Sequence, residues 1–399
     1  MRILIVSQYY YPERNSNKDI AEGLNKLGHK VTVITGKPNY GFQRILPQYK
    51  KTKYEVLNGV EIYRINLFPR KYSKISIYLN YLSFFFNAKR FARHLKQEFD
   101  VVLSISLSPV ISIAPAIVYA KKHHVPHVLI CEDLWPESTV VTKAVSYNSL
   151  IYKFLYSWSR NLYKKCDEII ISSPSFKDYF YDVLKLINKE YVYINQPIIQ
   201  SMKSRGQAIK YSHKYNFVYA GNIGKLQLTE NLVRAFSYFS KEDVAFHIMG
   251  MGNELNSILA LIDNLKMNNH IFYHGALPIE EAERYYKNAD ALIVSLKDEG
   301  YVGKTIPNKA IQYMKYQKPL IGVIKGDGRE LLKNGDGTLF SDENPTDIAK
   351  CIKTFLSLEV KEKETMGLNN VNYFNEKLSS EKLVKEIECE LLKIVHKTN

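Results

Sequence analysis

The sequence has little cysteine and no long apolar run. Its four cysteines, Cys131, Cys166, Cys351 and Cys389, lie far apart and form no Cys-x-x-Cys pair. That spacing excludes a disulfide scaffold and a zinc ribbon, and it is typical of a protein in a reducing compartment. No stretch reaches the roughly 20 apolar residues that a membrane-spanning helix needs. The chain opens on a strand pattern and lacks the layout of a signal peptide, so we expect a cytoplasmic protein.

Several enzyme motifs are also missing. The sequence has no Gx₄GK[ST] phosphate loop, no HExxH metal pair, no GxSxG nucleophile and no Asp-x-Asp. His123, His124 and His127 are close together, but they have no nearby carboxylate or thiolate at metal-ligand spacing. We therefore interpret these histidines as the end of a helix and the start of a strand.

Composition indicates a folded protein of two domains. The chain has 399 residues, of which 46% are hydrophobic and 24% are charged. It is too long for one ordinary hydrophobic core and too apolar to be mostly disordered. The net charge is +15, of which +13 falls in residues 1–200. A basic excess on one domain favours a polyanionic partner, either nucleic acid or an anionic membrane surface.

Apolar runs and helical patterns alternate along the first half. Residues 2–7 are an apolar run, a helical pattern then stops at Gly28, and a second apolar run follows at 31–35. This order predicts a right-handed βαβ unit in a parallel sheet. Further strands are expected at 101–105, 127–131 and 168–172, with helices at 109–122 and 150–165.

The same alternation restarts after a polar linker at 196–214. The strands expected in this half lie at 216–220, 245–249, 270–273, 291–295 and 320–323. We therefore predict two Rossmann-like, doubly wound α/β domains, 1–195 and 215–375, facing a central cleft. Loops at the carboxyl ends of their strands should line that cleft.

Two loops of the second half carry glycines directly after strands. Gly250 and Gly252 lack the third glycine of a dinucleotide fingerprint, so they indicate a turn that a ligand can approach, or else a plain tight turn. In the loop 221–225, backbone N–H groups and Lys225 could hold a phosphate. The alternative is a glycine turn with a solvated lysine.

The loop 303–309 is the sharpest local signal. It follows a strand, places Pro307 and Asn308 at the start of a helix, and carries Lys304 and Lys309. Free N–H groups at a helix start and nearby lysines attract anions, so we expect a ligand site here. The alternative is a capped helix with two surface lysines.

Two loops of the first half are candidate sites for a sugar or a base. Residues 132–137 combine three carboxylates with Trp135 after a buried strand, and residues 9–13 place three tyrosines and Glu13 in the first βα loop. The alternatives are a helix cap with a core tryptophan, and an aromatic loop packed on its own domain.

A basic strip at 62–97 contains no acidic residue. It holds eight basic residues and nine aromatics, with apolar residues at helical spacing and cations at both ends. This pattern favours a helix lying in a membrane interface, although a core helix with basic flanks is the alternative. A nucleic-acid partner is disfavoured because no recognition motif accompanies the charge. The candidate acceptor or membrane contacts are Arg70, Lys71, Lys74, Phe84, Phe85, Arg90, Arg93 and Lys96.

Taken together, the motifs resemble a retaining GT-B glycosyltransferase of glycosyltransferase family 4, over essentially the whole chain. They run from Tyr11-Pro-Glu13 through Asp133-Leu-Trp-Pro-Glu137-Ser138, Tyr219-Ala-Gly-Asn-Ile-Gly224 and Met249-Gly-Met-Gly252 to Thr305-Ile-Pro-Asn-Lys309. The second and last of these are similar to a bacterial subgroup that builds O-antigen and capsule on undecaprenyl-linked carriers.

The resemblance implies a nucleotide-sugar donor on the second domain, an acceptor on the first, no metal and no other cofactor. It also implies that a final helix, 376–399, packs back on the first domain. Asp133 and Glu13 would lie near the transferred sugar or the acceptor hydroxyl, and Lys225 would stabilise charge on the diphosphate. The donor-binding residues would be Gly221, Asn222, Gly224, Gly250, Gly252, Lys304, Thr305, Ile306, Pro307, Asn308 and Lys309.

The chain departs from the family pattern in the first loop and at four further positions. Arg14-Asn-Ser-Asn17 replaces the two glycines that usually follow the Tyr-Pro-Glu turn and would contact a phosphate. Asn222 and Gln227 stand where an Arg and a Lys are usual, and Lys304 and Gln312 replace two glutamates that normally face the donor. Either the subgroup varies here, or the donor is unusual or the site impaired.

From these features we predict a peripheral enzyme on the inner face of the cytoplasmic membrane. It would move a hexosyl or N-acetylhexosaminyl group from a nucleotide-sugar, with UDP favoured, to a polyprenyl-diphosphate-linked glycan during surface polysaccharide biosynthesis. The alternatives are a UDP-sugar epimerase of the same fold and a non-catalytic protein that binds nucleotide-sugars or glycans. The basic strip disfavours the first, and turnover of a donor would exclude the second.

Overall fold

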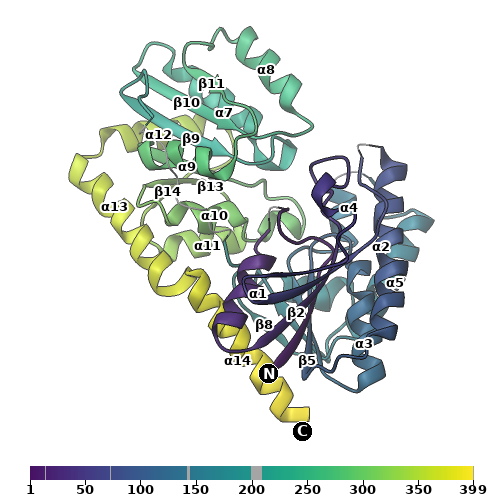
Figure 1. The fold of residues 1–399 in the computed structure, drawn as a ribbon. Helices are drawn as coiled ribbons and strands as arrows, with labels where there is room; N and C mark the ends of the chain where they lie inside the picture. The colour runs from purple at the N-terminus through teal and green to yellow at the C-terminus, as the bar shows by residue number, and fades with distance from the viewer. Residues whose placement is uncertain (14, 72, 142–143, 199–208, 399) are drawn as a thin grey trace. The chain divides into compact units, whose positions relative to one another are not determined.

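The computed structural model describes residues 1–13, 15–71, 73–141, 144–198 and 209–398 (Figure 1). The chain forms two compact units. The first comprises Met1–Ile199 with Ser380–Asn399, and the second is Gln200–Ser379. Ten residues of the linker expected at 196–214, namely 199–208, lie outside the described part.

The first unit is built on an eight-stranded sheet with the order β3-β4-β2-β1-β5-β6-β7-β8. All neighbouring strands are parallel except β3 and β4. Its central strands are buried along nearly their whole length because helices cover both faces. The strands are β1 (Arg2–Val6), β2 (Lys30–Gly36), β3 (Tyr54–Leu57), β4 (Val60–Ile65), β5 (Val101–Ser106), β6 (His127–Cys131), β7 (Glu168–Ile171) and β8 (Tyr191–Tyr193).

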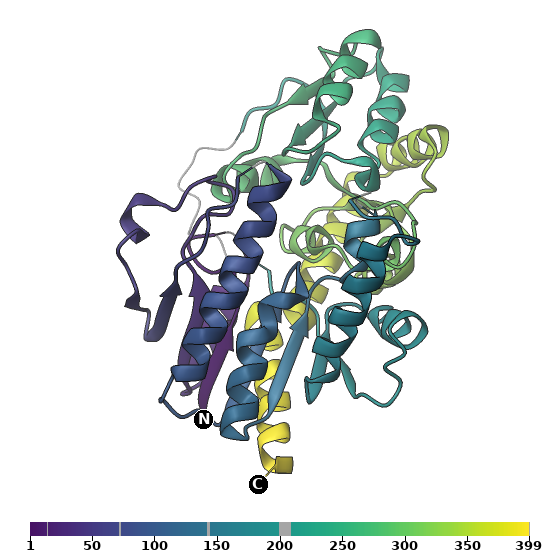
Figure 2. The ribbon, with the colours of Figure 1, turned by 90° about the vertical axis from the view of Figure 1, so that its right-hand side faces the viewer.

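Helices lie on both faces of this sheet (Figures 1 and 2). Successive residues of β1 face opposite helix layers: Leu4 packs with α2 and α3, whereas Ile3 packs with α1 and α14. Serine side chains cap two of the helices: Ser73 accepts the N–H of Ser76, and Ser149 accepts that of Tyr152. The helices are α1 (Asn17–Lys26), α2 (Lys74–His94), α3 (Ala114–His123), α4 (Glu137–Val141), α5 (Leu150–Lys164), α6 (Phe176–Asp178) and α14 (Ser380–Thr398).

The second unit has a six-stranded parallel sheet with the order β11-β10-β9-β12-β13-β14. Its core contains stacked phenylalanines, with the rings of Phe236 and Phe246 4.3 Å apart. The strands are β9 (Tyr215–Ala220), β10 (Val244–Met249), β11 (Ile271–Tyr273), β12 (Ala291–Ser295), β13 (Leu320–Val323) and β14 (Thr338–Phe340). The helices are α7 (Thr229–Phe236), α8 (Leu255–Asn264), α9 (Ile279–Asn288), α10 (Asn308–Met314), α11 (Gly326–Asn334), α12 (Pro345–Ser357) and α13 (Val360–Tyr373).

The predicted fold of two doubly wound α/β domains is confirmed, and so is the return of the last helix to the first unit. The helix expected within 376–399 is α14, which begins at Ser380 because Phe374–Leu378 form a separate π-helical turn and Ser379 is extended. None of the helices in the described ranges is long and apolar enough to cross a membrane.

Candidate active site

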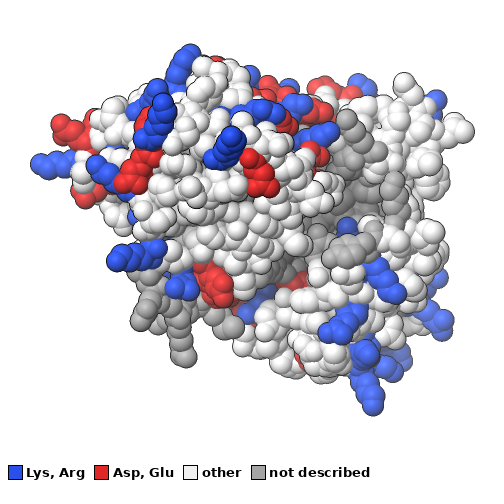
Figure 3. All heavy atoms as spheres, turned by 90° about the horizontal axis from the view of Figure 1, so that it is seen from above, with Lys and Arg blue, Asp and Glu red and all other residues white. Residues whose placement is uncertain are grey.

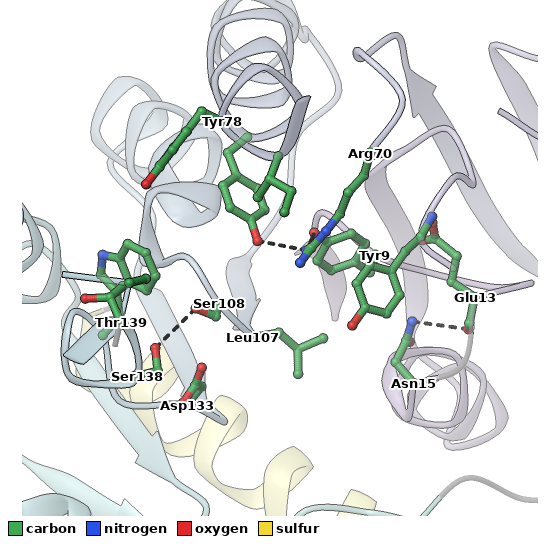
Figure 4. A pocket seen from close by; sticks show the side chains of 15 residues that line it. Tyr9, Glu13, Asn15, Arg70, Tyr78, Leu107, Ser108, Asp133, Ser138 and Thr139 are labelled. Atoms are coloured by element: carbon green, nitrogen blue, oxygen red, sulfur yellow. Dashed lines mark hydrogen bonds between the residues drawn. The ribbon is translucent and has the colours of Figure 1, made fainter. Parts of the chain in front are cut away.

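A cavity of about 620 Å³ lies in the first unit, at the carboxyl ends of its strands (Figure 4). Loops after β1, β2, β4, β5 and β6 contribute to its wall, and α2 closes one side. Five of the lining residues are tyrosine or tryptophan, which gives flat surfaces suited to a sugar ring. The cavity is lined by Tyr9, Glu13, Asn15, Tyr40, Arg70, Ile77, Tyr78, Tyr81, Leu107, Ser108, Asp133, Trp135, Ser138, Thr139 and Ala144.

Buried amides fix three of these loops to one another. The side-chain oxygen of Asn39 accepts the backbone N–H of Arg70 at 2.9 Å and the Asn80 amide at 2.9 Å. Asn80 in turn accepts from the side chain of Gln8 at 2.8 Å. Asn39 and Asn80 are fully buried. The network therefore holds the cavity wall in place before any ligand binds.

Glu13 ties two loops together. One carboxylate oxygen accepts the backbone N–H groups of Asn39 at 2.7 Å and Tyr40 at 2.6 Å, and the other accepts that of Tyr10. Burial nevertheless raises the pKa of Glu13 to about 7. This carboxylate, predicted to lie near the reacting sugar, lines the cavity while also holding its wall.

Asp133 lies in the same cavity, as predicted for the loop after β6. Desolvation raises its pKa to about 6, although the hydroxyls of Ser108 and Ser138 and the Leu134 N–H favour the charged form. The pKa of Asp133 is therefore close to the range in which a side chain can exchange protons near neutral pH. The indole Nε1 of Trp135, which lines the cavity too, is buried without a hydrogen-bond partner among the described residues.

Arg70 is the cation of this cavity. Its Nη1 donates to the Tyr9 hydroxyl at 3.1 Å and to the Tyr81 hydroxyl at 2.8 Å, and the guanidinium lies 4.8 Å from the Tyr40 ring centroid. No carboxylate of the described ranges lies within 4.0 Å of it. Arg70 thus faces the cavity, not the outer face of the basic strip, and is available to an anionic ligand.

In the second unit, glycines let two loops pack closely. A Cβ at Gly250 would lie 1.8 Å from the Gly221 carbonyl oxygen, and a Cβ at Gly252 would lie 2.0 Å from that of Ile223. The Ile223 N–H donates to Met251 at 2.9 Å, so pairing continues beyond β9 and β10. The close approach of the two loops therefore requires glycine at 250 and 252, and the donor contact expected of these residues stays a prediction.

Lys309 ends beside these loops. Its Nζ lies 2.8 Å from the Tyr219 hydroxyl, 3.9 Å from the Tyr219 ring centroid and 3.0 Å from the place of a Cβ on Gly221. The Tyr219 hydroxyl itself donates to the Asn222 carbonyl at 2.7 Å, so it accepts from Lys309. Burial lowers the pKa of Lys309 to about 7, and no carboxylate in the ranges described lies within 4.0 Å. An anion beside Lys309 would restore its charge.

The other predicted donor residues surround this lysine less tightly. Lys225 is exposed in a short turn after Gly224, and Lys304 is exposed with its Nζ 5.9 Å from the Tyr301 ring centroid. Thr305 is partly buried and donates to the Val302 carbonyl at 2.9 Å. Ile306 and Pro307 are partly buried, and Asn308 is exposed at the first position of α10. Asn222 and Gln227, which replace the usual Arg and Lys, are hydrogen-bonded to each other at 2.9 Å.

One residue of the basic strip, Phe84, was placed wrongly, and Phe85 is only partly exposed. Phe84 is fully buried against β1 and α3, because it lies on the face of α2 that meets the sheet. Phe85 is partly covered by Trp158, with ring centroids 5.7 Å apart. The exposed phenylalanine of the three is Phe86. The predicted contacts Lys71, Arg90, Arg93 and Lys96 are exposed, whereas the side chain of Lys74 lies outside the described part.

Tyr40, Tyr81 and Tyr219 were not expected as site residues. Tyr219 lies within a quoted motif, but tyrosines are so frequent in this chain, at 30 of 399, that no single one was distinctive. Only the fold brings these three rings to the two cations.

Comparison with known proteins finds a match to a glycosyltransferase family model in each half of the chain. Residues 15–198 match Glycosyltransferase Family 4, and residues 201–372 match Glycosyl transferases group 1. The chain is similar to a probable glycosyltransferase, WbjE, of Pseudomonas aeruginosa, with 25% identity over 257 residues. That match covers 58% of this chain and only 60% of the relative.

Solved structures of similar fold cover the whole chain. Sucrose-phosphate synthase from Thermosynechococcus elongatus has a TM-score of 0.75 at 15% identity, with 100% of each chain covered. Anabaena Alr3699/HepE, solved in complex with UDP, has a TM-score of 0.70 at 13% identity, covering 98% of this chain and 100% of its own. These likenesses establish the GT-B fold.

Proposed function

We propose that this chain, with a family 4 and a group 1 glycosyltransferase domain in one GT-B fold, is a retaining glycosyltransferase that takes its sugar from a UDP-sugar. The observation that carries the proposal is Lys309, a partly buried, desolvated lysine beside the paired loops of the second unit, with no carboxylate within 4.0 Å among the described residues. The likeness to a UDP-bound structure of the same fold supports UDP as the nucleotide.

Lys309 meets the electrostatic requirement of a leaving diphosphate. The positions where the family usually has an Arg and a Lys are occupied by Asn222 and Gln227, which are neutral and bonded to each other. The positive charge therefore comes from Lys309 beside Gly221, with Lys225 and Lys304 at the surface. With cations in this role, transfer needs no metal.

The cavity of the first unit holds the acceptor. Its aromatic rings can stack on a sugar ring, and the Asp133 carboxylate can accept a hydrogen bond from a sugar hydroxyl. The Arg70 guanidinium can pair with a phosphate. We therefore assign a polyprenyl-diphosphate-linked glycan as the acceptor and a hexosyl or N-acetylhexosaminyl group as the transferred sugar. The role is surface polysaccharide biosynthesis, such as that of O-antigen or capsule.

Transfer proceeds on one face of the donor sugar. The bond from C1 to the diphosphate oxygen breaks, and the acceptor oxygen forms a new bond to C1 on the same side. The acceptor proton passes to the departing diphosphate oxygen, while Lys309 and Lys225 stabilise the charge that develops there.

The enzyme works at the inner face of the cytoplasmic membrane. Residues 1–200 carry +13 of the net charge, and one face of the molecule gathers Lys and Arg at the lower right of Figure 3 with little Asp or Glu among them. Such a surface is attracted to anionic lipid.

The first test is a thermal-shift series with UDP, GDP, ADP and CMP. A nucleotide at about 100 times its Kd stabilises the unit that binds it by roughly 2.7 kcal/mol. We expect a shift with UDP alone. No shift with any of the four would favour the non-catalytic alternative.

Lys309→Met tests the residue itself. We expect the Kd for UDP to rise by about tenfold or more, because a buried charge pair is lost. Bound diphosphate raises the pKa of Lys309 from about 7, so binding takes up a proton above pH 7. The wild-type Kd should then increase with pH, by up to about tenfold per unit between pH 7.5 and 9.

The matched control is Lys353→Met, which removes an exposed lysine from α12 of the same unit. It should keep both the affinity and its pH dependence. If Lys309→Met binds UDP like the wild type, the diphosphate lies elsewhere and the assignment of this site fails.

A further inference from the structure

Two helices that are distant in the sequence form one surface without carboxylates. Neither α2, of 21 residues, nor α5, of 15 residues, contains Asp or Glu, although about one residue in ten of the whole chain is acidic. The helices pack together through Phe85 and Trp158, whose ring centroids are 5.7 Å apart. Figures 1 and 2 show them on the same face of the sheet.

Large apolar side chains are exposed in the first turns of both helices. Leu150 is 81% exposed and Ile75 is 73% exposed, which is unusual for residues of this size. On α2 the exposed positions recur every three or four residues and so form one stripe. The residues concerned, here called the α2–α5 surface, are Ile75, Tyr78, Leu79, Leu82 and Phe86 on α2, with Leu150, Ile151 and Phe154 on α5.

Cations lie on both helices. Lys89, Arg90 and Arg93 are in the second half of α2 and Lys164 ends α5, while Lys153 lies in the first turn of α5 beside the exposed apolar residues. None of them has a carboxylate within 4.0 Å in the part of the chain that the structure describes. α2 leads from β4 to β5 and α5 leads from β6 to β7, all of them parallel strands of one sheet, so the two helices run in the same direction. Their apolar ends therefore lie together, and their basic ends lie together.

The apolar end adjoins the cavity. Ile77 and Tyr78 of α2 line the cavity wall, and Tyr78 is also a member of the α2–α5 surface with 55% of the residue exposed. A ligand in the cavity therefore has a continuous apolar path along α2 to the outside.

We propose that the α2–α5 surface docks on an anionic lipid bilayer, with the first turns of both helices at interfacial depth and their cations over the headgroups. The charge decides the partner: a second copy would oppose cations to cations, whereas anionic lipid complements them. Docking itself does not depend on the proposed function, but the link to a lipid-linked acceptor rests on it. A lipid-linked acceptor in the cavity would have its lipid in the same bilayer.

The test is co-sedimentation of the full chain with vesicles of phosphatidylcholine, with and without about 30% phosphatidylglycerol. We expect the protein to bind the anionic vesicles. Salt at about 0.5 M should weaken this binding, because it screens charges strongly. Ile151→Ser with Phe154→Ser on α5, and Phe86→Ser on α2, should each lower the partition coefficient about tenfold or more. Ile187→Ser, which changes an exposed isoleucine outside the surface, should leave it unchanged.

UDP binding to each variant keeps the two proposals separable. It should stay at the wild-type level, because the proposed donor site lies in the second unit. Tryptophan fluorescence, which reports the first unit, shows that the variants are folded. Absence of wild-type binding to anionic vesicles would overturn the docking proposal even if UDP binds. Unchanged binding by the α5 variant would do the same, and so would a wild-type dimer that this variant converts to a monomer. Failure of UDP binding with vesicle binding intact would count against the proposed donor site only.

Discussion

Lys309 and Arg70 are both cations held by tyrosine hydroxyls rather than by carboxylates. A tyrosine hydroxyl orients a cation without neutralising it, so the charge remains available to a phosphate. Asp133 is the converse, a carboxylate held by serine hydroxyls in a cavity that disfavours its charge. In all three cases, hydroxyl groups hold a charged side chain in place without neutralising it.

Asp133→Asn should lower the transfer rate by about 100-fold or more, because a neutral amide cannot stabilise the positive charge that develops on the transferred sugar. In the wild type, transfer should fall as pH drops through about 6, where Asp133 protonates. Initial rates with a UDP-sugar measure both effects. UDP affinity should not change, since Asp133 belongs to the other unit. Asp178→Asn, an exposed aspartate of α6, is the control, and a D133N rate equal to it would remove Asp133 from the mechanism.

Among the elements, the loops after β9 and β10 show why a glycine motif follows a strand here. Gly250 has a φ of +136° and meets the Gly221 carbonyl where a side chain would begin. It lets the two loops extend the strand pairing beyond the sheet, which fixes Gly221 beside Lys309. The packing of the two loops is therefore sufficient to require glycine at 250.

Gly250→Ala should destabilise the second unit by more than about 2 kcal/mol, because a methyl group cannot fit against backbone. Gly275→Ala is the matched control: its φ is +76°, but nothing lies within 4 Å of the added Cβ. We expect it to cost about 1 kcal/mol. Thermal unfolding followed by circular dichroism compares the two. Equal losses of stability would mean that backbone conformation, and not the contact between the loops, requires glycine at 250.

β3 and β4 were not among the expected strands. They form a hairpin around Asn58 and Gly59, both with positive φ. Asn-Gly between alternating apolar residues is a strong hairpin signal, so this pair was predictable. Short β8 and β14, of three residues each, carry no comparable pattern.

On the scale of the whole molecule, the first unit buries carboxylates that prefer to be protonated. Burial raises the pKa of Glu13, Glu132, Glu137 and Glu168 to about 7 and that of Asp133 to about 6. Desolvation lowers the pKa of His127 in the same unit to about 3, which acts in the opposite direction. Because five groups have a raised pKa and one has a lowered pKa, the five determine how the stability of the first unit changes with pH.

A group whose folded pKa is raised contributes stability that is lost as pH rises through that pKa. The first unit should therefore be more stable at pH 5.5 than at pH 7.5, by about 2 kcal/mol. The chain has two tryptophans, Trp135 and Trp158, and both belong to this unit. Tryptophan fluorescence during urea unfolding thus reports it selectively, and a higher midpoint at pH 7.5 would contradict the prediction.

The sequence by itself determined the architecture, because strand and helix patterns are local and repeat in both halves. It also located the candidate loops, since loops after parallel strands meet at one edge of a sheet. It could not determine which member of a run is buried, as with Phe84 and Phe86, because that depends on how α2 rotates against the sheet. Nor could it pair Lys309 with Tyr219, Arg70 with Tyr81, or α2 with α5. These partners are 90, 11 and more than 50 residues apart, and only tertiary packing brings them together.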